Sequence, residues 1–121
     1  MKTNALILRA AALGLAGLLL GCAAPQPLYQ WNGYPAQVYS YLKNGDASPE
    51  HQIQVLEKGI AQNAGTHAAL PPGYQAHLGL LYLKAGRTND ALHAWEREKA
   101  AFPESTQFID HLIGNLKKNG T

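Results

Sequence analysis

Apolar residues recur at intervals of three and four along most of the chain, the spacing that places them on one face of a helix. Five such stripes lie between residues 35 and 118, and each is followed by a glycine or a proline. Their members are Val38, Tyr41 and Leu42; Ile53, Leu56 and Ile60; Tyr74, Leu78, Leu81 and Ala85; Ala91, Leu92 and Trp95; and Phe108, Ile109, Leu112, Ile113 and Leu116. No segment alternates apolar and polar residues long enough to predict a strand. The pattern therefore predicts an all-α domain of about five helices.

Short polar residues precede three of these helices. Ser48 is followed by Pro49 and Glu50, a residue order typical of a helix start. Thr88 and Ser105 stand in the same place before the last two stripes. We therefore expect the three hydroxyl side chains to cap the helices that follow them.

Before the first stripe the chain opens on a different pattern. Lys2 and Arg9 precede a small and apolar run over residues 10–20, which is much shorter than the roughly 20 residues that span a bilayer. A positive start, a short apolar run and a small residue at the cut are typical of a secretory signal peptide. The alternative is an ordinary apolar helix. We expect residues 1–21 to be a signal peptide.

The end of that run, Leu19-Leu20-Gly21-Cys22, resembles the lipobox of bacterial lipoproteins. The resemblance implies cleavage before Cys22 and acylation of its thiol, with three acyl chains on the mature terminus, enough for firm anchoring in a membrane. Cys22 is the only cysteine, so an internal disulfide is excluded. Ala23 follows it, whereas similar lipoproteins kept in the inner membrane chiefly carry Asp there. The resemblance thus favours the outer membrane, on its periplasmic side.

Cleavage would also change the charge. The chain has 10 Lys and Arg against 8 Asp and Glu, and removal of Lys2 and Arg9 leaves 8 of each. A neutral chain with scattered charges offers no basic surface for nucleic acid. The 100 residues that follow the cut suffice for one small domain.

A proline-rich tether and an aromatic segment lead into the helices. Residues 23–27 are small and uncharged, and Tyr29, Trp31 and Tyr34 follow within the next seven residues. Neither helical nor strand spacing is clean there, so we expect an extended arm that packs its rings on the domain. The predicted organisation is a signal peptide (1–21), a tether with the aromatic arm (22–34) and a helical domain (35–118).

A short repeat indicates how the helices are arranged. Residues 41–45 and 82–86 match at four of five positions, and residues 72–105 resemble a tetratricopeptide repeat. The residues that carry this resemblance are Leu78, Gly79, Tyr82, Gly86, Ala91, Trp95 and Pro103. Gly79 and Ala91 are small where two helix axes must approach to about 8–10 Å, and Tyr82 and Trp95 would fill the space beside them. Gln75 and Glu98 depart from the repeat's pattern.

Over residues 28–116 the chain also resembles a family of small bacterial lipoproteins known only as a domain of unknown function. Residues 28–34, 71–79 and 98–105 (LYQWNGY, PPGYQAHLG and EKAAFPES) carry this resemblance. Genes of that family tend to lie beside one for a lipoprotein similar to the curli secretion channel protein CsgG. The resemblance implies an envelope assembly with a CsgG-like lipoprotein as partner, and no known biochemical activity.

The residues that could support catalysis or metal binding are scattered. The five histidines are His51, His67, His77, His93 and His111, and none is spaced with another ligand as a metal site requires. No serine stands in a nucleophile motif, and Glu96 and Glu98 point to different faces of one helix. We expect no enzyme activity, no metal and no cofactor.

Binding is the function that remains. Tetratricopeptide repeats hold partners on a concave face, which transfers here to Gly73, Ala76, His77, Leu80, Leu83 and Lys84. Leu80 and Leu83 give this helix a second apolar face, so the helix should be covered on both sides. Either the arm, through Tyr29 and Trp31, or a partner would cover them.

The sequence predicts an outer-membrane lipoprotein that serves as a protein–protein docking module. Two hairpins fall short of the three repeats that usually make such arrays stable, which favours a partner or self-association. The alternatives are a pilotin-like chaperone for another outer-membrane protein and a periplasmic enzyme.

Overall fold

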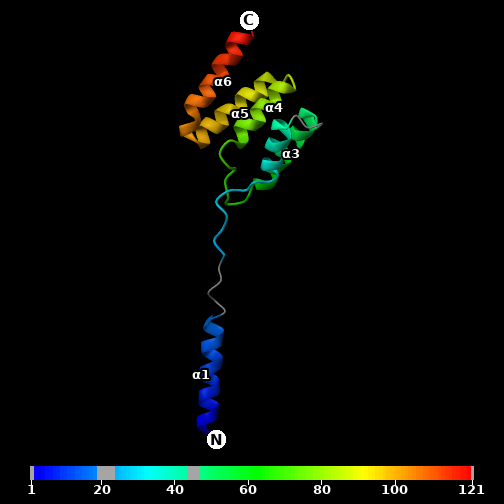
Figure 1. Cartoon of the computed structure of the whole chain (residues 1–121). Coiled ribbons are helices and arrows are strands. Elements are labelled where there is room, and N and C mark those ends of the chain that lie inside the picture. Colours follow the sequence, from blue (N-terminus) through cyan, green and yellow to red (C-terminus); the bar gives the residue numbers. More distant parts are fainter. Residues whose placement is uncertain (1, 19–23, 44–46, 121) are drawn as a thin grey trace.

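The computed structural model describes residues 2–18, 24–43 and 47–120 (Figure 1). Its helices are α1 (Lys2–Leu18), α2 (Tyr34–Leu42), α3 (Pro49–Asn63), α4 (Tyr74–Lys84), α5 (Thr88–Ala101) and α6 (Thr106–Asn119), with a 3₁₀ turn at Pro103–Ser105 before α6. Within these ranges the only β-type pairing is a single bridge between Tyr29 and Ala69. The all-α prediction is therefore confirmed. Cys22 and Gly45 lie outside the described residues.

The centre of the domain is the helix hairpin formed by α4 and α5, with α3 beside α4 and α6 following α5 (Figure 1). One apolar cluster joins α3, α4 and α5 through Ile53, Leu56, Tyr74, Leu78, Leu81, Tyr82, Ala91 and Ala94. A second cluster joins α4, α5 and α6 through Ala76, Trp95 and Ile109. Because α4 contributes to both clusters, it is covered on two faces.

The turn between α4 and α5 follows from Gly86, whose φ of 74° is the left-handed conformation that glycine adopts without strain. The Gly86 N–H donates to the Leu83 carbonyl at 3.0 Å, and the Arg87 N–H donates to the Tyr82 carbonyl at 2.8 Å. These two bonds form a Schellman motif and satisfy the last carbonyls of α4. The turn is so short that Arg87 occupies the N-cap of α5.

The predicted cap at Thr88 is therefore wrong. Thr88 is the first residue inside α5, and no side chain caps that helix. Ser105 precedes α6, but its hydroxyl donates to the Phe102 carbonyl instead of capping. The cap at Ser48 is confirmed, since its oxygen accepts from the His51 N–H at 3.2 Å. The N-cap residues of α5 and α6 are Arg87 and Ser105, and neither makes a side-chain capping bond.

Gly79 is placed where the indole of Trp95 lies against α4. A Cβ on Gly79 would come within 2.5 Å of Trp95 Cδ1, so only glycine fits. The indole N–H donates to the Ala76 carbonyl at 3.1 Å. The sequence predicted Gly79 and Ala91 at the contact with Trp95 beside it, whereas the indole itself occupies the space over Gly79. Ala91 is fully buried in the first cluster.

Helix α6 buries only part of its apolar stripe. Ile109 is fully buried whereas Phe108, which the stripe also includes, is exposed.

Among the described residues, no helix is both long enough and apolar enough to cross a bilayer.

Candidate functional site

The face of α4 predicted to bind a partner is contacted at both ends by α2, which buries His77 and leaves Lys84 exposed. His77 is buried, and the rings of Tyr34 and Tyr41 lie edge-on to it, with ring centroids 6.0 and 5.2 Å away. The Lys84 ammonium lies over the Tyr41 ring, 4.2 Å from its centroid, a cation–π contact. In this structure His77 and Lys84 therefore contact the chain's own helix.

The apolar part of that face packs within the domain. Leu80 and Leu83 are half-buried against the second cluster, as are Leu112, Ile113 and Leu116 of α6. The rings of the arm lie elsewhere: Tyr29 is 6.4 Å from Phe102, and Trp31 stacks on Tyr34 at 6.3 Å. Leu80 and Leu83 thus share a core with α6, an occupant the sequence did not suggest.

His77 is held neutral by its surroundings. Burial lowers its pKa below the ordinary value of 6.5, and a hydrogen bond to the backbone of Gln37 opposes this shift in part. Its Nε2 is buried with no hydrogen-bond partner. A second proton would have to enter a space closed by Tyr34 and Tyr41, so the site disfavours the imidazolium.

None of the nine residues of α2 is fully buried, so this helix lies on the domain's surface. Its outer side carries Tyr39, 63% exposed, and Leu42, 73% exposed. Residues three apart on a helix are neighbours, so these side chains form one apolar patch, with Lys43 over the Tyr39 ring. The patch lies on the element that covers the predicted docking face.

Residues 28–33, which we call the arm, are fixed to the domain at two points. The Gln30 N–H donates to the Ala69 carbonyl at 2.9 Å, and the Ala69 N–H donates to the Leu28 carbonyl at 3.1 Å. The side-chain amide of Asn32 donates to the Gly59 carbonyl of α3 at 2.9 Å. The arm therefore has a defined position although it is neither helix nor sheet.

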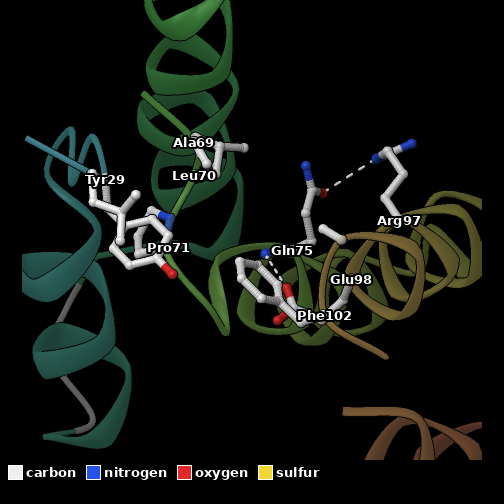
Figure 2. A pocket seen from close by; sticks show the side chains of 10 residues that line it. Tyr29, Ala69, Leu70, Pro71, Gln75, Arg97, Glu98 and Phe102 are labelled. Carbon is white, nitrogen blue, oxygen red and sulfur yellow. Dashed lines mark hydrogen bonds between the residues drawn. The ribbon is translucent and has the colours of Figure 1, made fainter. Parts of the chain in front are cut away.

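A cavity of about 410 Å³, which we call the arm pocket, lies between the arm and the end of α5 (Figure 2). Its lining is mostly apolar and consists of Leu28, Tyr29, Ala69, Leu70, Pro71, Gln75, Arg97, Glu98, Ala101 and Phe102. The Arg97 Nε–H donates to Gln75 Oε1 at 3.3 Å at the edge of the cavity. Apolar walls with few polar groups are the usual composition of a binding cavity.

Glu98 is 2% exposed and caps α4 from the neighbouring helix (Figure 2). Its Oε1 accepts from the Gly73 N–H at 2.6 Å, and its Oε2 accepts from the Gln75 and Ala76 N–H groups at 3.1 and 3.2 Å. The first N–H groups of a helix have no partner within it and carry partial positive charge. The carboxylate satisfies them, which makes it a structural group and leaves neither oxygen without a partner.

Tyr34 lies close to this carboxylate. Burial raises the pKa of its hydroxyl, and the negative charge of Glu98 raises it further. Its oxygen would meet a Cβ on Gly73 at 2.7 Å, and Gly73 has a φ of 87°.

Among the described residues, no group of three or more His, Cys, Asp or Glu side chains could hold a metal ion.

From the sequence, Glu98 was a departure from the repeat and one of two acids on different faces of a helix, although two signals pointed to its role. An acid at position 98 shares the stripe of Ala91, Ala94 and Trp95, so it had to be buried with a fixed partner. The start of α4 at Gly73 has no Ser, Thr, Asp or Asn to cap it, so its N–H groups had to find an acceptor elsewhere.

A family model described as "Domain of unknown function (DUF4810)" matches residues 28–112. The match begins at the first residue of the arm and ends within α6, so it contains α2, the α4–α5 hairpin and the arm pocket. No curated protein and no solved structure matches the chain.

Proposed function

The chain belongs to the family described as DUF4810, and we propose that it is a non-catalytic docking module of a cell-envelope assembly. In this proposal, acyl chains on Cys22 anchor it to the outer membrane, with the helical domain in the periplasm. A CsgG-like lipoprotein is the partner that the sequence resemblance suggests.

The observation that carries the docking role is the position of α2. It covers His77 and contacts the exposed Lys84 on the face where a tetratricopeptide-like hairpin would hold a partner, and it turns Tyr39 and Leu42 outward. An exposed pair of large apolar side chains on a small domain favours a protein contact. We therefore assign the partner's binding site to the outer side of α2, in place of the α4 residues beneath it.

The carboxylate of Glu98 also bears on the choice between binding and catalysis. Both of its oxygens accept backbone N–H groups, so it is committed to the fold. The mostly apolar arm pocket beside it suits a binding role.

The anchor is tested by Cys22→Ser. The variant should accumulate as an uncleaved or miscleaved precursor that incorporates no labelled palmitate, because the thiol that carries the acyl group is gone. Ser40→Ala, a hydroxyl change in the helical domain, serves as the control and should label normally. Normal palmitate labelling of Cys22→Ser would refute the proposed anchor.

The docking site is tested by photo-crosslinking in cells. A photoreactive residue at Leu42 should form an adduct with a CsgG-like lipoprotein, whereas the same residue at the exposed Phe108 on α6 should not. Tyr39→Asp, in a chain that carries the photoreactive residue at Leu42, should keep its thermal midpoint and lose the adduct. Equal adducts from Leu42 and Phe108, or an adduct that survives Tyr39→Asp, would refute the site.

A further inference from the structure

One end of the domain is built from two segments that carry no charged side chain. Residues 24–33 and 64–73 together contain no Asp, Glu, Lys or Arg, and His67 is their only titratable group besides Tyr29. We call this end the base. Every charged residue of the helical domain lies outside it, so the base differs chemically from the rest of the surface.

The two segments of the base lie side by side. The bridge between Tyr29 and Ala69 joins them, and a second cavity of about 560 Å³ lies between residues 26–30 and residues 66–68. Figure 1 shows the two segments together at the end of the domain where the chain enters from its N-terminal part. The base is thus one continuous surface.

Large apolar side chains project from this surface. Leu28 is 72% exposed and Trp31 is 51% exposed. Trp31 also lies edge-on to Tyr29, with ring centroids 6.5 Å apart. The two segments carry no charge of their own, and the exposed charge beside them in the arm pocket is Arg97. Exposed tryptophan and leucine on such a surface match the interfacial layer of a bilayer, where tryptophan and tyrosine concentrate.

The length of the tether indicates which occupant this surface has. Leu28 is six residues after Cys22, and six residues span at most about 20 Å when fully extended. A domain of about 100 residues has a radius of gyration near 13 Å, so the tether is comparable in length to the domain that it holds. An anchor at Cys22 therefore keeps the base close to the membrane surface.

We propose that the base is a membrane-contacting surface, and that Leu28 and Trp31 insert into the interfacial layer of the bilayer that carries the anchor. This inference rests on the proposed anchoring at Cys22. It fixes an orientation: the base lies on the lipid, and the domain is held against the membrane instead of moving freely on its tether.

Tryptophan fluorescence tests this directly, because the two tryptophans differ in exposure. Trp95 is 1% exposed in the core, whereas Trp31 is on the base. The full lipidated chain is reconstituted in phosphatidylethanolamine–phosphatidylglycerol vesicles, with or without brominated acyl chains that quench on contact. The Trp31→Phe variant reports Trp95 alone, so the difference between the two proteins gives the emission of Trp31.

Brominated lipid should remove most of the Trp31 emission and leave the Trp95 emission largely intact. Leu28→Glu should restore Trp31 emission, since it places a charge in the contact. Gln107→Glu adds the same charge at an exposed position of α6 and should change nothing. Unquenched Trp31 in a chain that floats with the vesicles would overturn the proposal.

Two other results separate the alternatives. Unquenched Trp31 whose emission maximum shifts when the protein is diluted with more lipid of the same composition would assign the base to contact with a second copy, which overturns the membrane proposal. A chain that does not float with the vesicles would refute the anchor itself, and with it this inference, whereas floating without quenching refutes only the contact.

Discussion

The α4–α5 hairpin and α2 are attached to the domain in opposite ways. The hairpin is held by buried polar bonds between the backbone of one helix and side chains of the other, as with Glu98 on the start of α4 and Trp95 on the Ala76 carbonyl. Helix α2 has no fully buried residue and contacts α4 through the rings of Tyr34 and Tyr41. The first arrangement tolerates little change, and the second depends on a few ring contacts.

The attachment of α2 over α4 and the stability of the α4–α5 hairpin can therefore change separately. Loss of a hydrogen bond in the hairpin leaves a buried polar group without a partner, which lowers the unfolding free energy of the whole domain. Loss of a ring contact at α2 removes partly exposed apolar area and should loosen that helix alone. Substitutions in the hairpin should therefore change global stability, whereas substitutions in α2 should change local opening of that helix.

The largest effect should come from Glu98→Ala. The change leaves the buried N–H groups of Gln75 and Ala76 and the partly buried N–H group of Gly73 without their acceptor, and each buried donor left unsatisfied costs roughly 1–3 kcal/mol of unfolding free energy. Urea unfolding followed by far-ultraviolet circular dichroism measures it. Glu96→Ala, on the exposed side of the same helix, is the control and should stay within about 0.5 kcal/mol of the wild type. Equal costs for the two changes would contradict the capping role.

A smaller effect, of opposite sign at two sites, is expected for glycine-to-alanine changes. Gly79→Ala forces a methyl group into the Trp95 indole and should cost about 1–3 kcal/mol. Gly114→Ala in α6 meets no atom within 4 Å, so it should instead stabilise the domain by roughly 0.5–1 kcal/mol, because alanine loses less entropy in a helix. Thermal midpoints that shift in the same direction would contradict the placement of the indole.

The sequence was sufficient for the helices and insufficient for what joins them. Spacings of three and four located the apolar stripes, because the face that a helix buries is determined by residues close together in the sequence. The capping of α4 by Glu98 joins residues 22 to 25 positions apart, and no local pattern states such a pair. Thr88 failed as a cap because the Schellman turn at Gly86 places Arg87 at the N-cap and Thr88 inside the first turn of α5.

The candidate site shows the same limit. The sequence predicted a second apolar side of α4 through Leu80 and Leu83, and both leucines pack against the second cluster. It named the arm or a partner as the cover, whereas α6 shares a cluster with the leucines and α2 contacts His77 and Lys84. Which of several amphipathic helices packs on a given face depends on chain connectivity and shape, and spacing alone does not encode these.

A third prediction concerns the attachment of α2. Tyr41→Ala removes the ring that contacts both His77 and Lys84, and a ring contact is worth roughly 0.5–1.5 kcal/mol beyond the area it buries. Amide hydrogen exchange should accelerate in α2 and stay unchanged in the α4–α5 hairpin. Tyr39→Ala changes an exposed tyrosine of the same helix and is the matched control. Faster exchange throughout the hairpin would show that α2 is an integral part of the core.

The smallest predicted effect is a loss of unfolding free energy through protonation of His77, which is absent at neutral pH and appears only in acid. Burial lowers the pKa of His77 below 6.5, so between that lowered value and 6.5 the unfolded chain binds a proton that the folded chain does not. The contribution to stability is therefore fully present above pH 6.5 and is lost as the pH falls through this window.

His77→Phe removes this titration while keeping a ring between Tyr34 and Tyr41. Between about pH 7.5 and pH 5, the wild type should lose more unfolding free energy than His77→Phe does, and urea unfolding at each pH measures the difference. Because α2 supplies both rings that enclose the imidazole, hydrogen exchange in acid should accelerate first in α2 of the wild type, before the hairpin responds. Parallel pH profiles for the two proteins would show that His77 gains its proton without disturbing α2. In that case the contacts with Tyr34 and Tyr41 would be too loose to exclude an imidazolium. Helix α2 and the α4–α5 hairpin would then differ only in how strongly each is attached to the domain.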